Sequence, residues 1–200
     1  MAPGKGGVER DPVTIHAHTF PGAGNAELLQ NAVTMTVTAS LAEKGLVINV
    51  TITNDKTGHH VPTDSPLRQL ILLVKASGGQ GQLLTFLDGS TVPDWGGVGD
   101  PQAGYYAGLP GTGYAKILEE IWTNITPSGA YWNPTRMLSD NRLAAFASDT
   151  TEYIFNAPVG EKISIEVSLL FRRAFKSIIE QKKWDAPDII MEQSKMLIQP

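Results

Sequence analysis

The chain of 200 residues contains no cysteine. Disulfides, thiolate zinc sites, iron–sulfur clusters, a cysteine nucleophile and covalent haem attachment through C-x-x-C-H are therefore excluded. Histidine is also scarce, because only four residues of this type occur. They form two close pairs, His16 with His18 and His59 with His60, so any imidazole chemistry is confined to two short segments.

A basic excess and a long apolar run are also missing. The formal net charge is −4, without long runs of one sign, which argues against a nucleic-acid partner. No stretch approaches the ~18 apolar residues of a membrane-spanning helix. The N-terminal segment "MAPGKGGVERDP" has no apolar core, so it does not predict a signal peptide. We expect a flexible lead-in over residues 1–11 and a single domain over residues 12–200.

The common catalytic motifs are absent from the sequence. It has no G-x-S-x-G, no H-E-x-x-H and no phosphate-binding loop, since the glycines of "GLPGTG" precede a tyrosine. No motif supports a hydrolase, and we predict a domain without catalytic activity.

Period-two alternation of apolar residues dominates the regular part of the chain. "AVTMTVTAS" and "GLVINVTITN" alternate and are separated by "AEKG", which predicts an antiparallel hairpin. "RQLILLVKA" is apolar on both faces, as a central strand would be, and "GQLLTFLDG" follows at hairpin distance. "EYIFNAPVGEKISIEVSLLFRR" predicts two more strands around a turn. The predicted core positions are Val33, Met35, Val37, Ile48, Val50, Ile52, Leu72, Val74, Ile165, Val167 and Leu169.

This pattern predicts a mainly β fold, an antiparallel β-sandwich with one or two short helices. Helices are expected in "GYAKILEEIW" and in "RAFKSIIEQKKW". Residues 88–148 form a long insertion rich in glycine, proline and aromatic residues. We expect the insertion to be ordered because its large aromatic side chains would cover a sheet: Trp95, Tyr105, Tyr106, Trp122, Tyr131 and Trp132.

The histidine pairs are the candidate binding residues. His16 and His18 in "TIHAHTF" share one face of an extended strand, and two imidazoles on one face are half of a metal site. His59 and His60 point to opposite sides of an extended chain, so only one of them would join His16 and His18 in a site for a divalent metal such as zinc or copper. The alternative is ordinary loop chemistry, since "NDKTGHHVPTD" is rich in turn residues.

Two motifs around these histidines occur in a fixed order. His18 to Gly22 has the form H-x-F-x-G, and Gly58 to Arg68 is similar to G-H-x-x-P-T-G-x-P-x-R ahead of an apolar strand. Together with "GLPGTGYAKIL", "DNRL" and "SLLFRRAF", the chain resembles the cysteine-free, β-rich C-terminal domain of multihaem c-type cytochromes. The sequence departs from the pattern at Asp64, where that family usually has glycine.

The resemblance implies a role in electron transfer beside a haem-bearing c-type cytochrome domain or subunit. It implies that His18, or less readily His16, is an axial ligand to a haem held by that partner. His59 would be a second ligand or would orient a haem propionate, and C-x-x-C-H repeats would precede this segment in the full gene. It also implies a periplasmic or extracellular location. The alternative function is a self-contained metal- or carbohydrate-binding module.

Overall fold

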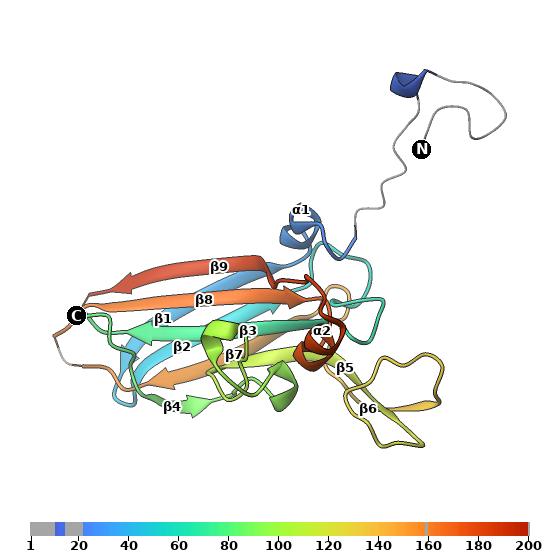
Figure 1. Cartoon of the computed structure of the whole chain (residues 1–200). Coiled ribbons are helices and arrows are strands. Elements are labelled where there is room, and N and C mark those ends of the chain that lie inside the picture. The colour runs from blue at the N-terminus through green and yellow to red at the C-terminus, as the bar shows by residue number, and fades with distance from the viewer. Residues whose placement is uncertain (1–10, 15–21, 159, 200) are drawn as a thin grey trace.

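The structure is a computed structural model that describes residues 11–14, 22–158 and 160–199 (Figure 1). In these residues nine strands and two α-helices follow one another along the chain. They are α1 (Ala26–Gln30), β1 (Thr34–Ala42), β2 (Gly45–Thr53), β3 (Gln69–Ser77), β4 (Phe86–Gly89), β5 (Gly111–Glu120), β6 (Thr135–Asp140), β7 (Ser148–Phe155), β8 (Ile163–Arg172), α2 (Lys176–Lys182) and β9 (Ile189–Ile198). Short 3-10 helices occupy Pro12–Thr14, Asp94–Gly96 and Pro101–Ala103.

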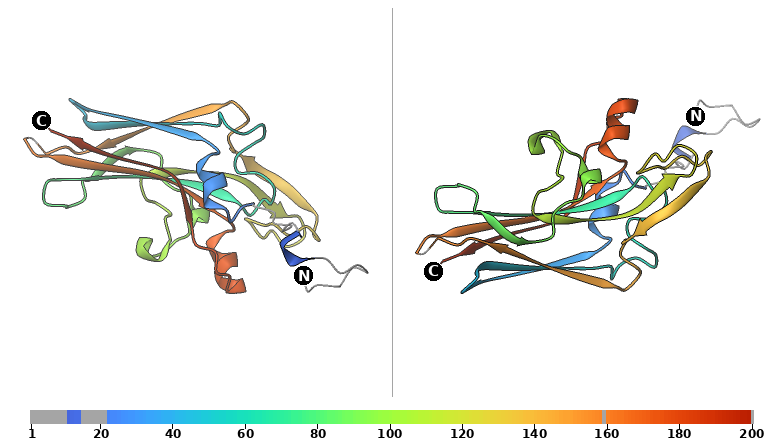
Figure 2. Two further views of the ribbon diagram at one scale, coloured as in Figure 1. Left: turned by 90° about the horizontal axis from the view of Figure 1, so that it is seen from above. Right: turned by 90° about the horizontal axis from the view of Figure 1, so that it is seen from below.

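The strands form two antiparallel sheets that pack face to face. The four-stranded sheet has the order β1-β2-β7-β4, and the five-stranded sheet has the order β6-β5-β3-β8-β9. Figure 2 shows the two sheets as separate layers, with the N-terminal helix α1 at one side. This arrangement confirms the predicted antiparallel β-sandwich.

The space between the sheets is the main hydrophobic core. Nine of the eleven predicted core residues are at most 3% exposed, and the other two, Met35 and Val37, are half-buried against them. Both half-buried residues lie on β1, an edge strand of the four-stranded sheet. An edge strand has a neighbour on one side only, so its inward side chains remain partly open to solvent.

A second apolar layer covers the outer face of the five-stranded sheet. Ile71 and Leu170 of that face are buried under Val92, Trp95 and Tyr106. Helix α2 and the residues around 94–106 lie on this side, away from the four-stranded sheet (Figure 2). Strand β3 is therefore covered on both faces, which explains why its sequence is apolar without alternation.

The helix expected in "GYAKILEEIW" is wrong, because these residues form most of strand β5. β5 pairs with β3 from Gln69↔Ala115 to Leu73↔Gly111. Gly113 is required there, since a Cβ atom would collide with the ring of Trp95. The segment is buried on both faces along much of its length, so it lacks the strict alternation by which a strand is predicted.

Strand β4 does not form a hairpin with β3. The turn after β3 closes with Leu84 N–H donating to the Ala76 carbonyl at 2.9 Å. The chain then crosses to the other sheet, where β4 pairs with β7. The predicted hairpin is therefore wrong, and the segment between β3 and β4 is a crossover from one sheet to the other.

The segment 88–148 is folded onto the sandwich and contributes strands β5 and β6 to the five-stranded sheet. Trp95 and Tyr106 pack on the outer face of the sheet as predicted, whereas Tyr105 packs against Gly97, Gly99 and helix α2. The prediction is wrong for the other three aromatic residues. Trp122 is 71% exposed, Tyr131 is 93% exposed and Trp132 is 69% exposed.

Helix α2 confirms the helix expected after the last long inner strand. In the described part of the chain, no helix has the length and apolar character needed to cross a bilayer.

Candidate functional site

A buried asparagine holds the loop that carries the second histidine pair. The amide nitrogen of Asn54 lies 2.7 Å from the carbonyl oxygen of His59 and 3.1 Å from the carbonyl oxygens of Leu143 and Ala144. Its oxygen accepts a 2.6 Å bond from the hydroxyl of Thr57. The side chain is fully buried, so it ties the histidine loop to a segment that lies far away in sequence.

The loop is fastened again just after the histidines. Val61 and Leu143 exchange backbone hydrogen bonds of 2.9 and 3.0 Å in an isolated bridge. Val61 and Pro62 are both buried. Because the backbone is held on both sides, the loop presents His59 and His60 from a fixed support.

The geometry of His59 settles which ring nitrogen is available for binding. Its Nδ1 lies 2.9 Å from the carbonyl oxygen of His60. A carbonyl oxygen only accepts, so Nδ1 carries the proton and donates this bond. In the neutral ring the unprotonated nitrogen is then Nε2, which is the nitrogen that can ligate a metal or a haem iron.

His59 lines a pocket of about 290 Å³. The apolar part of the wall comes from α1, the turn after His60 and the end of β8: Ala23, Leu28, Leu29, Ala32, Val61, Pro62 and Phe171. The polar part comes from Lys56, Thr57, Thr63 and Arg68. His60 is exposed and does not line this pocket, so the two histidines lie in different environments.

Asp64 lies in the turn between the pocket and β3. Its φ of +68° is in the left-handed region, which favours glycine. This is the position where the resembling family usually has glycine, so the backbone keeps the conformation that the glycine would take. The carboxylate of Asp64 lies 2.8 Å from Arg68 Nη2, and Arg68 Nη1 donates to the Thr63 carbonyl at 3.2 Å.

The first histidine pair, His16 and His18, lies outside the described residues. Among the described residues, no three His, Asp or Glu side chains converge on a site that could hold a metal ion. A metal site with His59 would therefore need His16 or His18. Gly22 and Ala23, which follow the first histidine segment, line the same pocket as His59.

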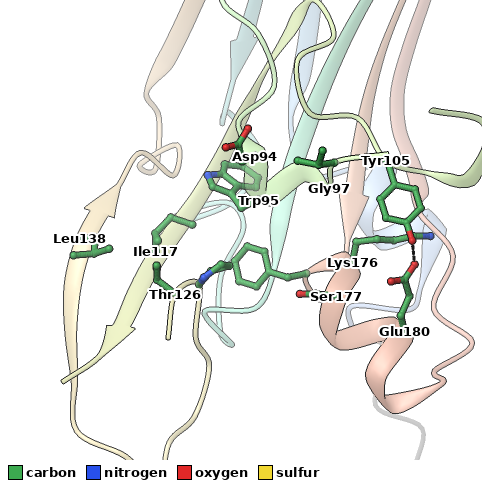
Figure 3. Close-up of a pocket in the computed structure, with 13 residues that line it drawn as sticks. Asp94, Trp95, Gly97, Tyr105, Ile117, Thr126, Leu138, Lys176, Ser177 and Glu180 are labelled. Atoms are coloured by element: carbon green, nitrogen blue, oxygen red, sulfur yellow. Dashed lines mark hydrogen bonds between the residues drawn. The ribbon is translucent and has the colours of Figure 1, made fainter. Parts of the chain in front are cut away.

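A larger hollow of about 570 Å³ lies between α2 and the β5–β6 hairpin (Figure 3). Trp95, Ile117 and Leu138 supply apolar walls, and Figure 3 shows Tyr105 hydrogen-bonded to Glu180 at its edge. This hydrogen bond raises the pKa of Tyr105. Lys176 is held by the Ala103 carbonyl at 2.7 Å, so it is already engaged. No histidine is among the described residues that line the hollow, and we place the candidate site in the smaller pocket at His59.

The β5–β6 connection is a second feature that the sequence did not reveal. Residues 121–134 carry no charged side chain, and they display Trp122, Tyr131 and Trp132 to solvent. The rings of Tyr131 and Trp132 meet edge to face at 5.0 Å between centroids. The loop is thus an exposed aromatic surface at the end of the β5–β6 hairpin.

One carboxylate organises this aromatic loop. Glu120 is almost fully covered, and it accepts 2.8 Å hydrogen bonds from the side chains of Thr123, Ser128 and Asn133. These three bonds, in that order of importance, hold the pKa of Glu120 below its ordinary value of 4.5. The loop is therefore shaped by the ionised form of one side chain.

Replacing Glu120 with glutamine is expected to loosen residues 121–134, because the amide would turn donor hydrogens toward groups that are themselves donors. Hydrogen exchange of the loop amides should become faster while the strands stay protected. Acid should have the same effect. Since the pKa is lowered on folding, the stabilisation is present above about 4.5 and is lost as the pH falls through the lowered value.

The matched control is Glu119→Gln, because Glu119 pairs with Arg136 and makes no bond to the loop. Equal loop exchange in the wild type and in Glu120→Gln at pH 7 would show that the carboxylate does not organise the loop.

Comparison with known proteins gives a fold relationship. No family model and no curated protein matches the sequence. Among solved structures, a penta-haem cytochrome c552 from Thermochromatium tepidum is similar, with a TM-score of 0.67 and 18% sequence identity. The match covers 90% of this chain and 43% of that chain. The β-sandwich described above is therefore also the fold of part of a multihaem cytochrome chain, and this chain spans less than half the length of that protein.

Proposed function

We propose that this domain is non-catalytic and works in electron transfer beside a haem-bearing c-type cytochrome domain or subunit. In this role it presents His59, together with His18, to a haem that the partner holds. The observation that carries the proposal is that His59, whose Nε2 is left free by the bond at Nδ1, lines a pocket with apolar and cationic walls. The fold shared with part of a penta-haem cytochrome supports it. With this role we propose a periplasmic or extracellular location, as the sequence resemblance implies.

The residues at the pocket fit one edge of a haem. The imidazole nitrogen offers an iron ligand, the leucines of α1 and Phe171 offer apolar contact, and Lys56 with Arg68 suits propionate groups. When bound, a haem supplies the one-electron redox chemistry that the protein side chains lack.

The same pocket is too small to enclose a whole haem. Its volume of about 290 Å³ is at the lower end of the roughly 300–1,000 Å³ of small-molecule sites. The chain has no cysteine, so it also has no covalent attachment point for a haem. Both facts support a haem that is held by a partner and is only touched by this domain.

Covalent geometry keeps His18 within range of this pocket. Gly22 lines the pocket and follows His18 by four residues, so the two Cα atoms can be at most about 14 Å apart. The proposal therefore takes His18 as the residue of the first histidine pair that joins His59 at the haem. His16, two residues further away, is the less favourable ligand in this proposal.

The proposal is tested by titrating the chain with ferric haem and following the absorption band of the ligated iron. The wild type should bind weakly, and binding should decrease in acid because a protonated imidazole cannot ligate. His59→Ala and His18→Ala should each reduce binding several-fold. His60→Ala is the matched control, since His60 is adjacent but does not line the pocket. Unchanged binding in the double variant His18→Ala with His59→Ala would contradict the proposal.

A second candidate function is carbohydrate binding. It is favoured by the three exposed aromatic side chains on an uncharged loop, because sugar rings stack on such surfaces. Retention of the chain on a polysaccharide, without a response to haem, would favour this alternative.

A further inference from the structure

We infer that Arg68, assisted by Lys56, forms a carboxylate-binding subsite beside His59, and that Asp64 is a built-in competitor for it. The ligand class is an apolar ring system that carries carboxylates, as a porphyrin does. The inference rests on the proposed function for its location, but it concerns contacts that do not involve iron.

The charges around the pocket are one-sided. Lys56, His59 and Arg68 line it, and no Asp or Glu occurs among the described residues that do so. Lys56 Nζ donates to the Val33 carbonyl at 3.1 Å, so its ammonium group is held in place. Two cations over apolar walls favour a ligand that is anionic at one end and apolar in its body.

Lys56 is the weaker of the two cations. Burial raises the pKa of the Glu192 carboxyl, and Lys56 opposes this shift from nearby. Asp55, the neighbour of Lys56 in the sequence, also acts on Glu192. The ammonium group of Lys56 is a point charge that already donates to the Val33 carbonyl, whereas the guanidinium of Arg68 is a planar fork that matches a carboxylate, so Arg68 is the main anion-binding group.

The guanidinium of Arg68 has more hydrogen-bond donors than it uses within the chain. It has five N–H groups, and it contacts the Thr63 carbonyl and the Asp64 carboxylate. The Asp64 side chain is 72% exposed, while the Arg68 side chain is 23% exposed. An ion pair with one partner so open to water is weak, so a carboxylate that arrives on an apolar body can share the guanidinium or displace Asp64.

Asp64 opposes such a ligand in two ways. It neutralises part of the charge on Arg68, and it repels an incoming carboxylate. With Asp64 at φ +68°, its carboxylate lies 2.8 Å from Arg68 Nη2, where a carboxylate of the ligand would bind. Removing the charge of Asp64 should therefore strengthen binding of an anionic ring.

The test uses iron-free protoporphyrin IX as the probe, which has two carboxylates on an apolar macrocycle and no iron for His59 to ligate. Binding is followed by porphyrin fluorescence. Asp64→Asn should bind about three- to tenfold more tightly than the wild type, as expected for one unit charge at a partly solvated site. Asparagine is chosen because it tolerates a positive φ. Added salt should reduce this difference.

Arg68→Gln should lose about tenfold or more in affinity, and Arg68→Lys, which keeps the charge but not the planar fork, should lose less than Arg68→Gln. Glu43→Gln is the charge-matched control, because Glu43 is exposed in the β1–β2 turn at the other end of the sandwich (Figure 1). Far-ultraviolet circular dichroism and thermal unfolding of each variant check that the fold is kept.

The outcomes separate this inference from the proposed function. If the wild type does not bind the probe, or if Asp64→Asn binds like Glu43→Gln, the subsite is wrong, whatever haem does. If Asp64 and Arg68 control the probe but His59→Ala leaves haem binding unchanged, the subsite stands and the proposed ligation by His59 fails. Haem binding that depends on His59 but not on Arg68 supports the proposed function and overturns the subsite.

Discussion

Replacing Arg172 with methionine is expected to lower the free energy of unfolding by about 3–5 kcal/mol. The side chain is 1% exposed and forms a two-bond pair with Asp188, at 2.7 Å for each contact. It also donates to the carbonyls of Gly96 at 2.8 Å and Gly104 at 2.7 Å, and it lies over the ring of Tyr106. Its loss would leave the Asp188 carboxylate and the Gly104 carbonyl without this partner under the outer layer, and the Gly96 carbonyl would keep only the 3.3 Å bond from the Tyr106 N–H.

Urea unfolding of Arg172→Met measures this effect. The matched control is Arg173→Met, because Arg173 is the next residue but its side chain is exposed. This control should change the stability by no more than about 0.5 kcal/mol. Changing Asp188 to leucine in the Arg172→Met background should restore part of the loss, since the unpaired, partly buried carboxylate is then removed. Equal unfolding midpoints for Arg172→Met and Arg173→Met would show that the buried pair does not hold the outer layer.

Replacing Val50 with aspartate is expected to unfold the domain. Val50 is fully buried on β2 between the two sheets. A buried carboxylate without a partner costs several kcal/mol, and domains of this kind have a total stability of about 5–15 kcal/mol. Circular dichroism at 25 °C should lose its β-sheet signal, and the cooperative thermal transition should disappear or shift to a much lower temperature.

The control for Val50→Asp introduces the same charge on the solvent side of the neighbouring strand. Thr36 is exposed on β1 and lies opposite Thr51 of β2. Thr36→Asp should leave a cooperative transition close to that of the wild type. A folded Val50→Asp variant would mean that the inward face of β2 has been assigned to the wrong side.

The sequence predicted the strands that have one buried and one open face. β1 and β2 show strict alternation because one side faces the other sheet and the other side faces water. β5 was mistaken for a helix because Tyr114 packs inward while Ala115 and Ile117 are covered from outside by Phe175. Cover on both faces removes the alternation, and only the tertiary structure shows what provides it.

Composition could not decide which way the aromatic residues of the middle segment face. It gave the apolar area that the segment carries, but the direction of each ring depends on how the loop is held. Trp95 is turned onto the sheet, next to Gly113, whereas the loop around Glu120 turns Trp122 and Trp132 outward. The exposed aromatic loop was therefore found only in the structure.

The candidate site was predicted in part. The sequence identified His59 and a turn rich in proline, and the structure places His59 at a pocket. The groups that define its geometry were missed, because Asn54 reaches the Leu143 and Ala144 carbonyls across 89 and 90 residues of chain. The Asp64–Arg68 ion pair could not be predicted from the sequence, because it depends on the left-handed backbone conformation of Asp64 in the turn.

The strand order has a consequence for the time course of folding. Among the strands that the structure describes, only the β1–β2, β5–β6 and β8–β9 pairs join strands that follow one another in the chain. β2 pairs with β7, which is synthesised much later. The hydroxyls of Thr51 and Thr150, which are hydrogen-bonded between these two strands, are 99 residues apart in the sequence. β3 likewise pairs with β8, which also follows much later in the chain. During synthesis, β2 stays uncovered on the β7 side until residues up to Phe155 have emerged, and β3 stays uncovered on the β8 side until residues up to Arg172 have emerged.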